Sequence, residues 1–325
     1  MQYIVNSYVF LFLKKHKISW GEYMKNAINY YYNIVPNSIH QMGKIYRFTT
    51  NDSNYILTPF DLVHEVKDIY ELSNSLLQKG VPINQIILNN SNQVLTTINE
   101  MSYVLMKIHI PNNILTFEDI INFNNFNVRN SENNKLIRND WFTLWTKKID
   151  YFEYQINQLG KKYPLIRESF SYFVGLAENA ISLVKNTPID NSRLVVGHRR
   201  IRANDTLYDL YNPLNLIIDY RVRDITEYFK SAFLNNEYNI EEIMSYLYYA
   251  NLSNTECILF FARMLFPTFY FDIYEKIISE HGTEEELIII IEKIEDYENL
   301  ITKLYYYFKS IMPFPEIEWL KKRIS

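Results

Sequence analysis

The spacing of apolar residues changes along the first third of the chain, and each change predicts a different element. Residues 1–35 place apolar side chains three and four positions apart, which predicts a helix. Residues 43–50 and 55–59 are short runs rich in β-branched and aromatic side chains, and the polar turn NDSN separates them. This pattern predicts two strands joined as a hairpin.

A well-bounded amphipathic helix and further strands are predicted next. Residues 59–80 place Leu, Val and Ile side chains on one helical face, begin with Pro-Phe-Asp and end at a glycine. Residues 85–90 and 93–98 are predicted to form a second strand pair. Residues 102–110 are predicted to form one more strand.

The rest of the chain is nearly all helical in pattern. Residues 140–159 carry Trp141 and Trp145 four positions apart on one apolar face, and residues 168–186 predict a second strong helix. An Asn-rich stretch at 122–134 predicts a loop. The aromatic faces of these helices are expected to pack as core.

Two short apolar runs, 193–198 and 215–220, interrupt the helical part and predict a strand hairpin. We therefore expect an α+β protein with two lobes: a small mixed lobe over 1–110, and a larger, mainly helical lobe over 111–325 that carries the hairpin near 193–220. This order of elements is that of a protein-kinase-like fold. Such a fold holds a nucleotide between a sheet and a helical lobe, and the chemistry lies on hairpin loops of the second lobe.

The composition is that of a folded protein without an overall basic field. Hydrophobic residues make up 48% of the chain and charged residues 22%, and the net charge is −4 with a pI near 5.9. These values exclude a disordered chain and give no reason to expect nucleic acid as a partner. The 7 glycines form neither a dinucleotide-binding fingerprint nor a P-loop. The 28 tyrosines allow a cross-linkable surface, but a coding bias explains them as well.

The single cysteine, Cys257, excludes an intramolecular disulfide and fits a reducing compartment. Its apolar surroundings favour a buried, inert thiol over a reactive nucleophile, which would need an electropositive and accessible environment. No convincing targeting segment is present, and the apolar runs YVFLFL and LIIII are too short to span a bilayer. We therefore expect synthesis in the cytoplasm without a signal peptide, and no membrane span.

The stretch HRRIRAND, after the first hairpin strand, has the frame of a kinase catalytic loop without its base. In that frame the catalytic Asp comes two residues after a His, and an Asn comes five residues after the Asp. Here His198 is in place, but Arg200 occupies the Asp position and Asp205 the Asn position. A guanidinium is always protonated and cannot act as a base. We interpret these residues as a degenerate catalytic loop, with His198 a structural remnant buried beneath it.

Two further kinase positions give opposite indications. Asp219, in the second strand IIDY, stands where a metal-binding carboxylate is expected, which keeps Mg²⁺ and ATP as candidate cofactors. Asp224 is expected to cap the next helix. In contrast, the lysine that holds the nucleotide phosphates is expected at or near Thr58, and no lysine occurs between Lys44 and Lys67.

The helix that follows this strand offers no clear replacement for the lysine. Lys67 lies in the middle of the helix, where a solvated position is expected. Glu65 or Glu71 stands where kinases have the carboxylate that pairs with the lysine. Without the lysine, both are more simply interpreted as surface charge.

Five potentially cationic side chains gather around the loop of this net acidic chain: Arg193, His198, Arg199, Arg200 and Arg202. One interpretation is internal ion pairing with the carboxylates of Asp205, Asp209, Asp219 and Asp224. The other is that Arg199, Arg200 and Arg202 bind an anionic group, such as a phosphate or an acidic patch on a partner, through bidentate contacts. The other five histidines show no metal-ligand spacing, and no metal site is expected.

Several segments of the chain together resemble a known family. They are INEMSYVLMKIHI, WFTLWTKKIDYFEYQI, SYFVGLAENAIS, LVVGHRR, LIIDYRVRDITEYFK, RMLFPTFYFDIYE and PEIEWL. In their order and spacing they resemble the superfamily of aminoglycoside phosphotransferases and spore-coat kinase-like proteins, and within it the YutH-like spore coat proteins. The resemblance implies the two-lobed fold, a place in the spore coat, and other spore coat proteins as partners. It does not imply catalysis, because members of this kind look degenerate at the active site.

The leading hypothesis is a non-catalytic, kinase-like protein, a pseudokinase, that acts as a structural or assembly component of the spore coat. The alternative is an ATP- and Mg²⁺-dependent phosphotransferase on a small hydroxylated or amino substrate, with Asp219 and Asp205 holding the metal. A third hypothesis is a nucleotide-binding sensor without turnover. Arg200 and the lysine-free strand at 55–59 favour the first.

Overall fold

A computed structural model describes residues 20–110, 113–126, 134–159, 161–188, 194–280 and 282–322. The chain forms two compact units. The first consists of the described residues of Met1–Ile114, Glu132–Leu136 and Asp205–Leu216, and the second of those of Leu115–Ser131, Ile137–Asn204 and Ile217–Ser325. The helix predicted for residues 1–35 is confirmed over α2 (Trp20–Tyr32), and the part of that prediction before Trp20 lies outside the described residues.

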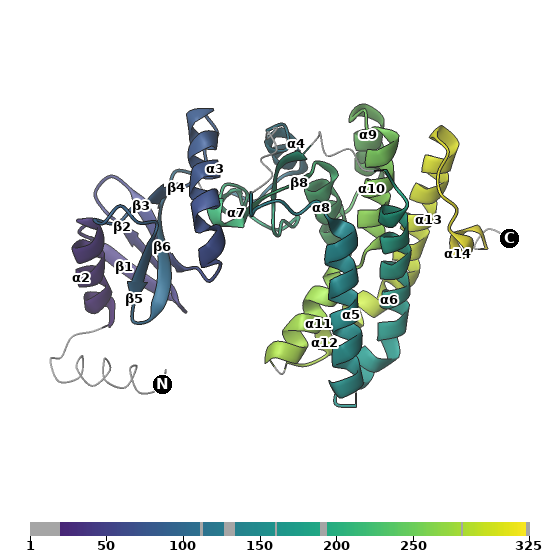
Figure 1. Cartoon of the computed structure of the whole chain (residues 1–325), viewed down its shortest axis with the longest axis horizontal. Coiled ribbons are helices and arrows are strands. Elements are labelled where there is room, and N and C mark those ends of the chain that lie inside the picture. Colours follow the sequence, from purple (N-terminus) through teal and green to yellow (C-terminus); the bar gives the residue numbers. More distant parts are fainter. Residues whose placement is uncertain are drawn as a thin grey trace. The chain divides into compact units, whose positions relative to one another are not determined.

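The first unit is built on an antiparallel sheet (Figure 1). Its strands are β1 (Ser38–Met42), β2 (Ile45–Thr49), β3 (Asn54–Pro59), β4 (Gln85–Ile87), β5 (Leu95–Ile98) and β6 (Met101–Ile108). They follow the order β1-β2-β3-β6-β4, and β5 also pairs with β6. The predicted hairpin is confirmed as β2 and β3, whereas β1 is not predicted by the sequence pattern.

The strand pair predicted for residues 85–90 and 93–98 is wrong in its pairing. Both strands exist, but β4 and β5 each pair with β6 and not with each other. The tight turn between two apolar runs suggests a hairpin, yet the longer strand β6 provides the hydrogen-bonding partner for both.

The helix α2 packs on the sheet of the first unit. Met24, Ile28 and Tyr32 recur every four residues, so they lie on one face of the helix and are buried against Phe48 and Leu105. Burial of each large apolar side chain contributes about 1.5–3 kcal/mol. The apolar period seen in the sequence therefore corresponds to the core of this unit.

The amphipathic helix predicted for residues 59–80 is confirmed in the same unit. It consists of the 3-10 turn η1 (Val63–Glu65) and α3 (Val66–Gln78). Gly80 follows with a φ of +80°, a left-handed conformation that favours glycine and ends the helix. Two short elements from later in the chain, α7 (Leu207–Leu210) and η3 (Pro213–Asn215), also belong to this unit.

The second unit is mainly helical (Figure 1). Its helices are α4 (Phe117–Phe123), α5 (Trp141–Leu159), α6 (Pro164–Lys185), α8 (Val222–Leu234), α9 (Ile240–Tyr249), α10 (Asn254–Leu265), α11 (Thr268–Glu280), α12 (Glu285–Glu292), α13 (Ile294–Ile311) and α14 (Glu318–Lys321). α5 lies beside α6, and α10 packs against α6, α8 and α13. The helices predicted at 140–159 and 168–186 are confirmed as α5 and α6. The second begins earlier than predicted, at Pro164, because proline is well tolerated in the first helical turn.

The second predicted hairpin is confirmed as β7 (Leu194–His198) paired with β8 (Leu216–Tyr220). Every residue of both strands is buried. This burial explains why the two runs are continuously apolar and do not alternate with polar residues. Arg193, which the sequence assigns to the basic loop, lies outside the described residues.

The apolar helices of the second unit form its core. Cys257 on α10 is buried, as predicted, and burial raises the pKa of its thiol to about 11. Among the described residues, one helical stretch, Asn254–Ser279, is long and apolar enough to cross a membrane by length and composition. Since 72% of its most apolar window is buried inside the protein, this stretch also has the burial of a core helix.

Candidate functional site

His198 ends β7 and is buried, as predicted, with 1% of its surface exposed. Its Nδ1 lies 2.7 Å from Oδ2 of Asp224, and its backbone N–H donates to Oδ1 of the same carboxylate over 3.1 Å. Asp224 lies in the first turn of α8, but the N-cap of that helix is Arg221. The prediction that Asp224 is the N-cap of this helix is therefore wrong. Its carboxylate binds His198, the residue that precedes the loop.

The close approach of Asp224 also explains a glycine in β7. A Cβ atom added to Gly197 would lie 3.2 and 3.3 Å from the two carboxylate oxygens of Asp224. Those oxygens are held by His198, so they have little room to retreat. Gly197 and His198 thus both serve the same buried contact: Gly197 leaves room for the carboxylate of Asp224, and His198 binds it.

Asp219 lies on β8 and is completely buried. Its carboxylate accepts hydrogen bonds from Nε1 of Trp141 at 3.0 and 3.1 Å, from the backbone N–H of Tyr220 at 2.8 Å, and from Nη1 of Arg223 at 2.8 Å. Burial raises the pKa of Asp219 above its ordinary value, and the lowering effects of Arg223, Arg263 and Trp141 offset this only in part. Because every one of these contacts donates a hydrogen to it, the ionised carboxylate is the form that fits this environment.

Arg223 connects Asp219 to the degenerate loop. Besides Asp219, its guanidinium donates to the carbonyl oxygens of His198 and Arg199, both at 3.0 Å. The side chain of Arg223 is 13% exposed. A fixed cation therefore already neutralises the carboxylate that the sequence assigns to a metal.

These surroundings do not fit a bound Mg²⁺ ion. A magnesium site needs carboxylate or amide oxygens with room for water molecules around the metal, and the oxygens of Asp219 face Trp141 and Arg223 instead. The described residues contain no group of three or more His, Cys, Asp or Glu side chains that could hold a metal ion. Asp205, the other candidate ligand, is grouped with the first unit.

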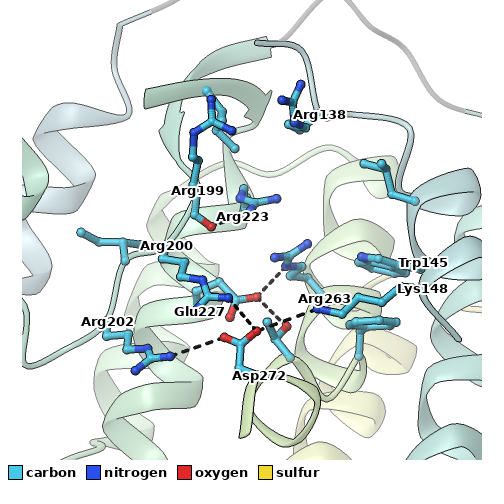
Figure 2. A pocket seen from close by; sticks show the side chains of 15 residues that line it. Arg138, Trp145, Lys148, Arg199, Arg200, Arg202, Arg223, Glu227, Arg263 and Asp272 are labelled. Carbon is cyan, nitrogen blue, oxygen red and sulfur yellow. Dashed lines mark hydrogen bonds and ion pairs between the residues drawn. The ribbon is translucent and has the colours of Figure 1, made fainter. Parts of the chain in front are cut away.

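Arg200 and Arg202 turn toward a carboxylate on α11 (Figure 2). Nη2 of Arg200 lies 3.4 Å from Oδ1 of Asp272, and Nη2 of Arg202 lies 3.4 Å from its Oδ2. Nζ of Lys148, on α5, lies 3.9 Å from Oδ1. Three cations thus share one carboxylate, at distances longer than the roughly 2.7–2.9 Å of strong charge-assisted hydrogen bonds.

One of the ion pairs expected from the sequence is confirmed, since His198 binds Asp224. Two of the other carboxylates bind different groups: Asp219 binds Arg223, and Asp209 forms a capping box with Thr206, the N-cap of α7. Asp272, which no sequence motif indicates, pairs with both Arg200 and Arg202. It lies about seventy residues further along the chain, so no local pattern indicates it.

A pocket of about 500 Å³ opens in the second unit beside this loop. We call it the cationic pocket, because seven of its lining side chains are basic: Arg138, Lys148, Arg199, Arg200, Arg202, Arg223 and Arg263. Two lining residues are acidic, Glu227 and Asp272. Trp145 and Phe266, stacked with their ring centres 4.4 Å apart, form an apolar part of its wall.

The floor of the pocket contains a buried charge network that the sequence pattern does not predict. Nζ of Lys230 donates to Oε1 of Glu227 at 2.7 Å and to two backbone carbonyl oxygens and a threonine hydroxyl at 2.9–3.1 Å. Nε of Arg263 donates to the same oxygen of Glu227 at 2.6 Å. Burial alone would raise the pKa of Glu227, but Lys230 and Arg263 outweigh it and lower the pKa to about 2.

This lowered pKa predicts a loss of stability in acid. The ordinary value for Glu227 is 4.5, so its ion pairs stabilise the folded protein fully above pH 4.5 and are lost as the pH falls toward 2. The shift corresponds to about 3 kcal/mol of the free energy of unfolding. Urea unfolding between pH 6 and 3, for the natural protein and Glu227→Gln, measures it. The difference in stability between the two should shrink below pH 4.5, and a constant difference would contradict the assignment.

The first unit lacks the expected lysine on the strand where kinases carry it. β3 contains none, and Thr58 pairs with Val104 on β6. Lys107 of β6 pairs with Tyr55, three residues from Thr58, so it points to the opposite face of the sheet. Lys67 on α3 is 83% exposed, as expected, and pairs with Glu71.

The surface position expected for Glu65 is wrong. This residue is 3% exposed, whereas the side chain of Glu71 is 62% exposed. Glu65 ends the turn η1 and precedes the first residue of α3, and its Oε1 lies 3.3 Å from Nε2 of His64.

A small antiparallel lobe followed by a mainly helical lobe with a buried hairpin defines the class of protein. It is the kinase-like fold of the aminoglycoside phosphotransferases. An aminoglycoside phosphotransferase from Alicyclobacillus acidocaldarius superposes with a TM-score of 0.63 at 12% identity, over 86% of this chain and 94% of that one. The AMP-bound spectinomycin phosphotransferase APH(9)-Ia gives 0.60 at 12% identity, over 87% and 98%.

Within this class, the chain belongs to the family described as "Spore coat putative kinase YutH", whose model matches residues 25–304. A relative in this family is the endospore coat-associated protein YutH of Bacillus subtilis (strain 168). It is 23% identical over 314 residues, which cover 86% of this chain and 92% of the relative. The predicted fold class and the predicted family are thus both confirmed.

Proposed function

We propose that this chain is a non-catalytic, kinase-like protein that takes part in the spore coat as a structural or assembly component. The observation that carries the proposal is the environment of Asp219: the expected metal ligand is buried and bound to Arg223 and Trp141. The name of the Bacillus subtilis relative, an endospore coat-associated protein, supports the place in the coat. Other coat proteins are then its partners.

Two further observations support the absence of phosphoryl transfer. The position of the catalytic base holds Arg200, whose guanidinium cannot accept a proton and lies near Asp272. The strand that should provide the phosphate-binding lysine has none. A base and a cation on the phosphates each contribute orders of magnitude to such a reaction, so their joint loss leaves little to drive it.

The alternative, a phosphotransferase on an amino substrate, conflicts with the charge of the pocket. Structural neighbours include a choline kinase from Streptococcus pneumoniae and a microcompartment-associated aminopropanol kinase. Choline is a cation, and aminopropanol is protonated at neutral pH. The cationic pocket, with seven basic side chains and two acidic ones, repels such molecules.

An ATP titration tests the catalytic part of the proposal. The protein is incubated with millimolar ATP, with Mg²⁺ in one arm and EDTA in the other, and ADP formation and the melting temperature Tm are measured. We expect no ADP above the protein-free control and no stabilisation that depends on magnesium, because a ligand that binds the folded state raises Tm. Turnover would overturn the proposal, and a magnesium-dependent rise in Tm without turnover would favour the nucleotide sensor.

The coat assignment needs its own experiment. Coats purified from spores of the organism that carries this chain should contain it, while a cytoplasmic marker protein should be removed by the same washes. Detection of the protein in the washes alone would contradict a place in the coat, whatever the result with ATP.

A further inference from the structure

We propose that the cationic pocket binds a small polyanion, a molecule that carries two or more phosphate or carboxylate groups. This inference goes beyond the proposed function, because a protein that transfers no phosphoryl group can still hold an anion. It rests on the charge, the geometry and the size of the pocket.

The charge of the pocket is opposite to that of the whole chain. Seven basic against two acidic lining residues leave a formal excess of five positive charges, in a chain whose net charge is −4. Two carboxylates outside the lining, Asp219 and Glu275, pair with Arg223 and Lys148, and the lining still has an excess of three. Like charges held this close repel one another, and a ligand that carries several negative charges relieves the repulsion. A singly charged anion would leave most of it in place.

The arginines at the rim of the pocket, Arg200 and Arg202, can exchange the carboxylate that they now contact for another anion. Arg200 and Arg202 have side chains that are 64% and 55% exposed, and each lies 3.4 Å from an oxygen of Asp272. An incoming oxyanion can make shorter, bidentate contacts with the same guanidinium groups. Asp272 then acts as the anion that the rim holds while no ligand is bound, and the ligand competes with it (Figure 2).

The floor of the pocket is fixed in advance. Arg263 is 5% exposed, is held by Glu227, and lies 5.1 and 5.6 Å from the ring centres of Trp141 and Trp145. Arg223 is held by Asp219 and two loop carbonyl groups. Pre-ordered cations lower the entropic cost of binding. The volume of about 500 Å³ is that of a small-molecule site, which are typically roughly 300–1,000 Å³.

Calorimetric titration of the whole protein with two probes, in EDTA and at low salt, tests the proposal. Inorganic tripolyphosphate represents the phosphate source and citrate the carboxylate source, and orthophosphate is the reference. We expect at least one probe to bind saturably and roughly tenfold or more tighter than orthophosphate, since several charged contacts form at once. The probe that binds identifies the kind of anionic group.

Two variants locate the site. Arg200→Ala with Arg202→Ala should weaken binding roughly tenfold or more. The control, Lys67→Ala with Lys147→Ala, removes the same charge from exposed positions outside the pocket and should leave affinity unchanged. Asp272→Asn removes the competing carboxylate and should tighten binding several-fold. A purely structural role for Asp272 gives no such gain.

The proposal is overturned if neither probe binds, if the control variant weakens binding as much as the arginine variant, or if Asp272→Asn weakens it. These results leave the question of catalysis untouched. Turnover of ATP with magnesium would overturn the proposed function, whereas a failure to bind metal-free polyanions would overturn the anion site alone.

Discussion

Replacing Asp219 by alanine should be among the most destabilising single changes in the second unit. The variant leaves the guanidinium of Arg223, 13% exposed, without its carboxylate, and removes the acceptor of the Trp141 indole N–H. Breaking a buried ion pair by removing one partner costs about 3–5 kcal/mol. Urea unfolding at pH 7 measures the loss.

The control for this prediction is Asp150→Ala, which removes an exposed carboxylate from α5 and should change stability by about 0.5 kcal/mol or less. A second variant tests whether the loss of stability comes from the unpaired charge of Arg223. If Arg223 is replaced by leucine in the Asp219→Asn background, no buried cation remains unpaired, and part of the stability should return. Equal stability of Asp219→Ala and Asp150→Ala would show that the ion pair contributes nothing.

Replacing Glu227 by alanine should have a comparable effect for a different reason. One carboxylate oxygen of Glu227 accepts from both Lys230 and Arg263, whose side chains are 2% and 6% exposed. Its removal leaves two cations buried without an anion, which costs about 3–5 kcal/mol or more. Thermal and urea unfolding at pH 7 measure the change.

A neighbouring glutamate provides the comparison. Glu275 on α11 also pairs with a lysine, Lys148, but its side chain is 43% exposed. Exposed pairs contribute about 0–1 kcal/mol, so Glu275→Ala should be nearly neutral. If Glu227→Ala and Glu275→Ala lower the free energy of unfolding equally, the buried network around Glu227 contributes no more than an exposed ion pair.

The sequence predicts the order of elements well, because apolar period and turn residues are local. It yields both hairpins, α3, α5 and α6, and it places His198 in the core. It misses the pairing of β4 and β5, since the choice of partner strand depends on contacts distant in sequence.

The residues of the candidate site likewise divide into those that the sequence indicates and those that only the structure reveals. The loop arginines stand out in the sequence, but their partner Asp272 lies on an aromatic helix far along the chain, where nothing distinguishes it from a surface charge. The sequence around Lys230 is that of an ordinary exposed helix lysine, and its burial results from tertiary packing. One contact of the site can be predicted from the sequence. Arg223 follows Asp219 by four residues, a spacing that permits a local ion pair.

The ion pair between Asp219 and Arg223 also bears on how this chain can change. Introducing an acidic residue at position 200 would place a base in the loop, yet Asp219 would still be bound to Arg223. Losing Arg223 first would leave a buried carboxylate with no cation beside it, and the destabilised protein would be removed by selection. The order that starts with Arg223 passes through a destabilised variant, and the order that starts with position 200 leaves Asp219 bound to Arg223. The pair between Asp219 and Arg223 therefore opposes a stepwise change of this chain toward a metal-binding kinase loop.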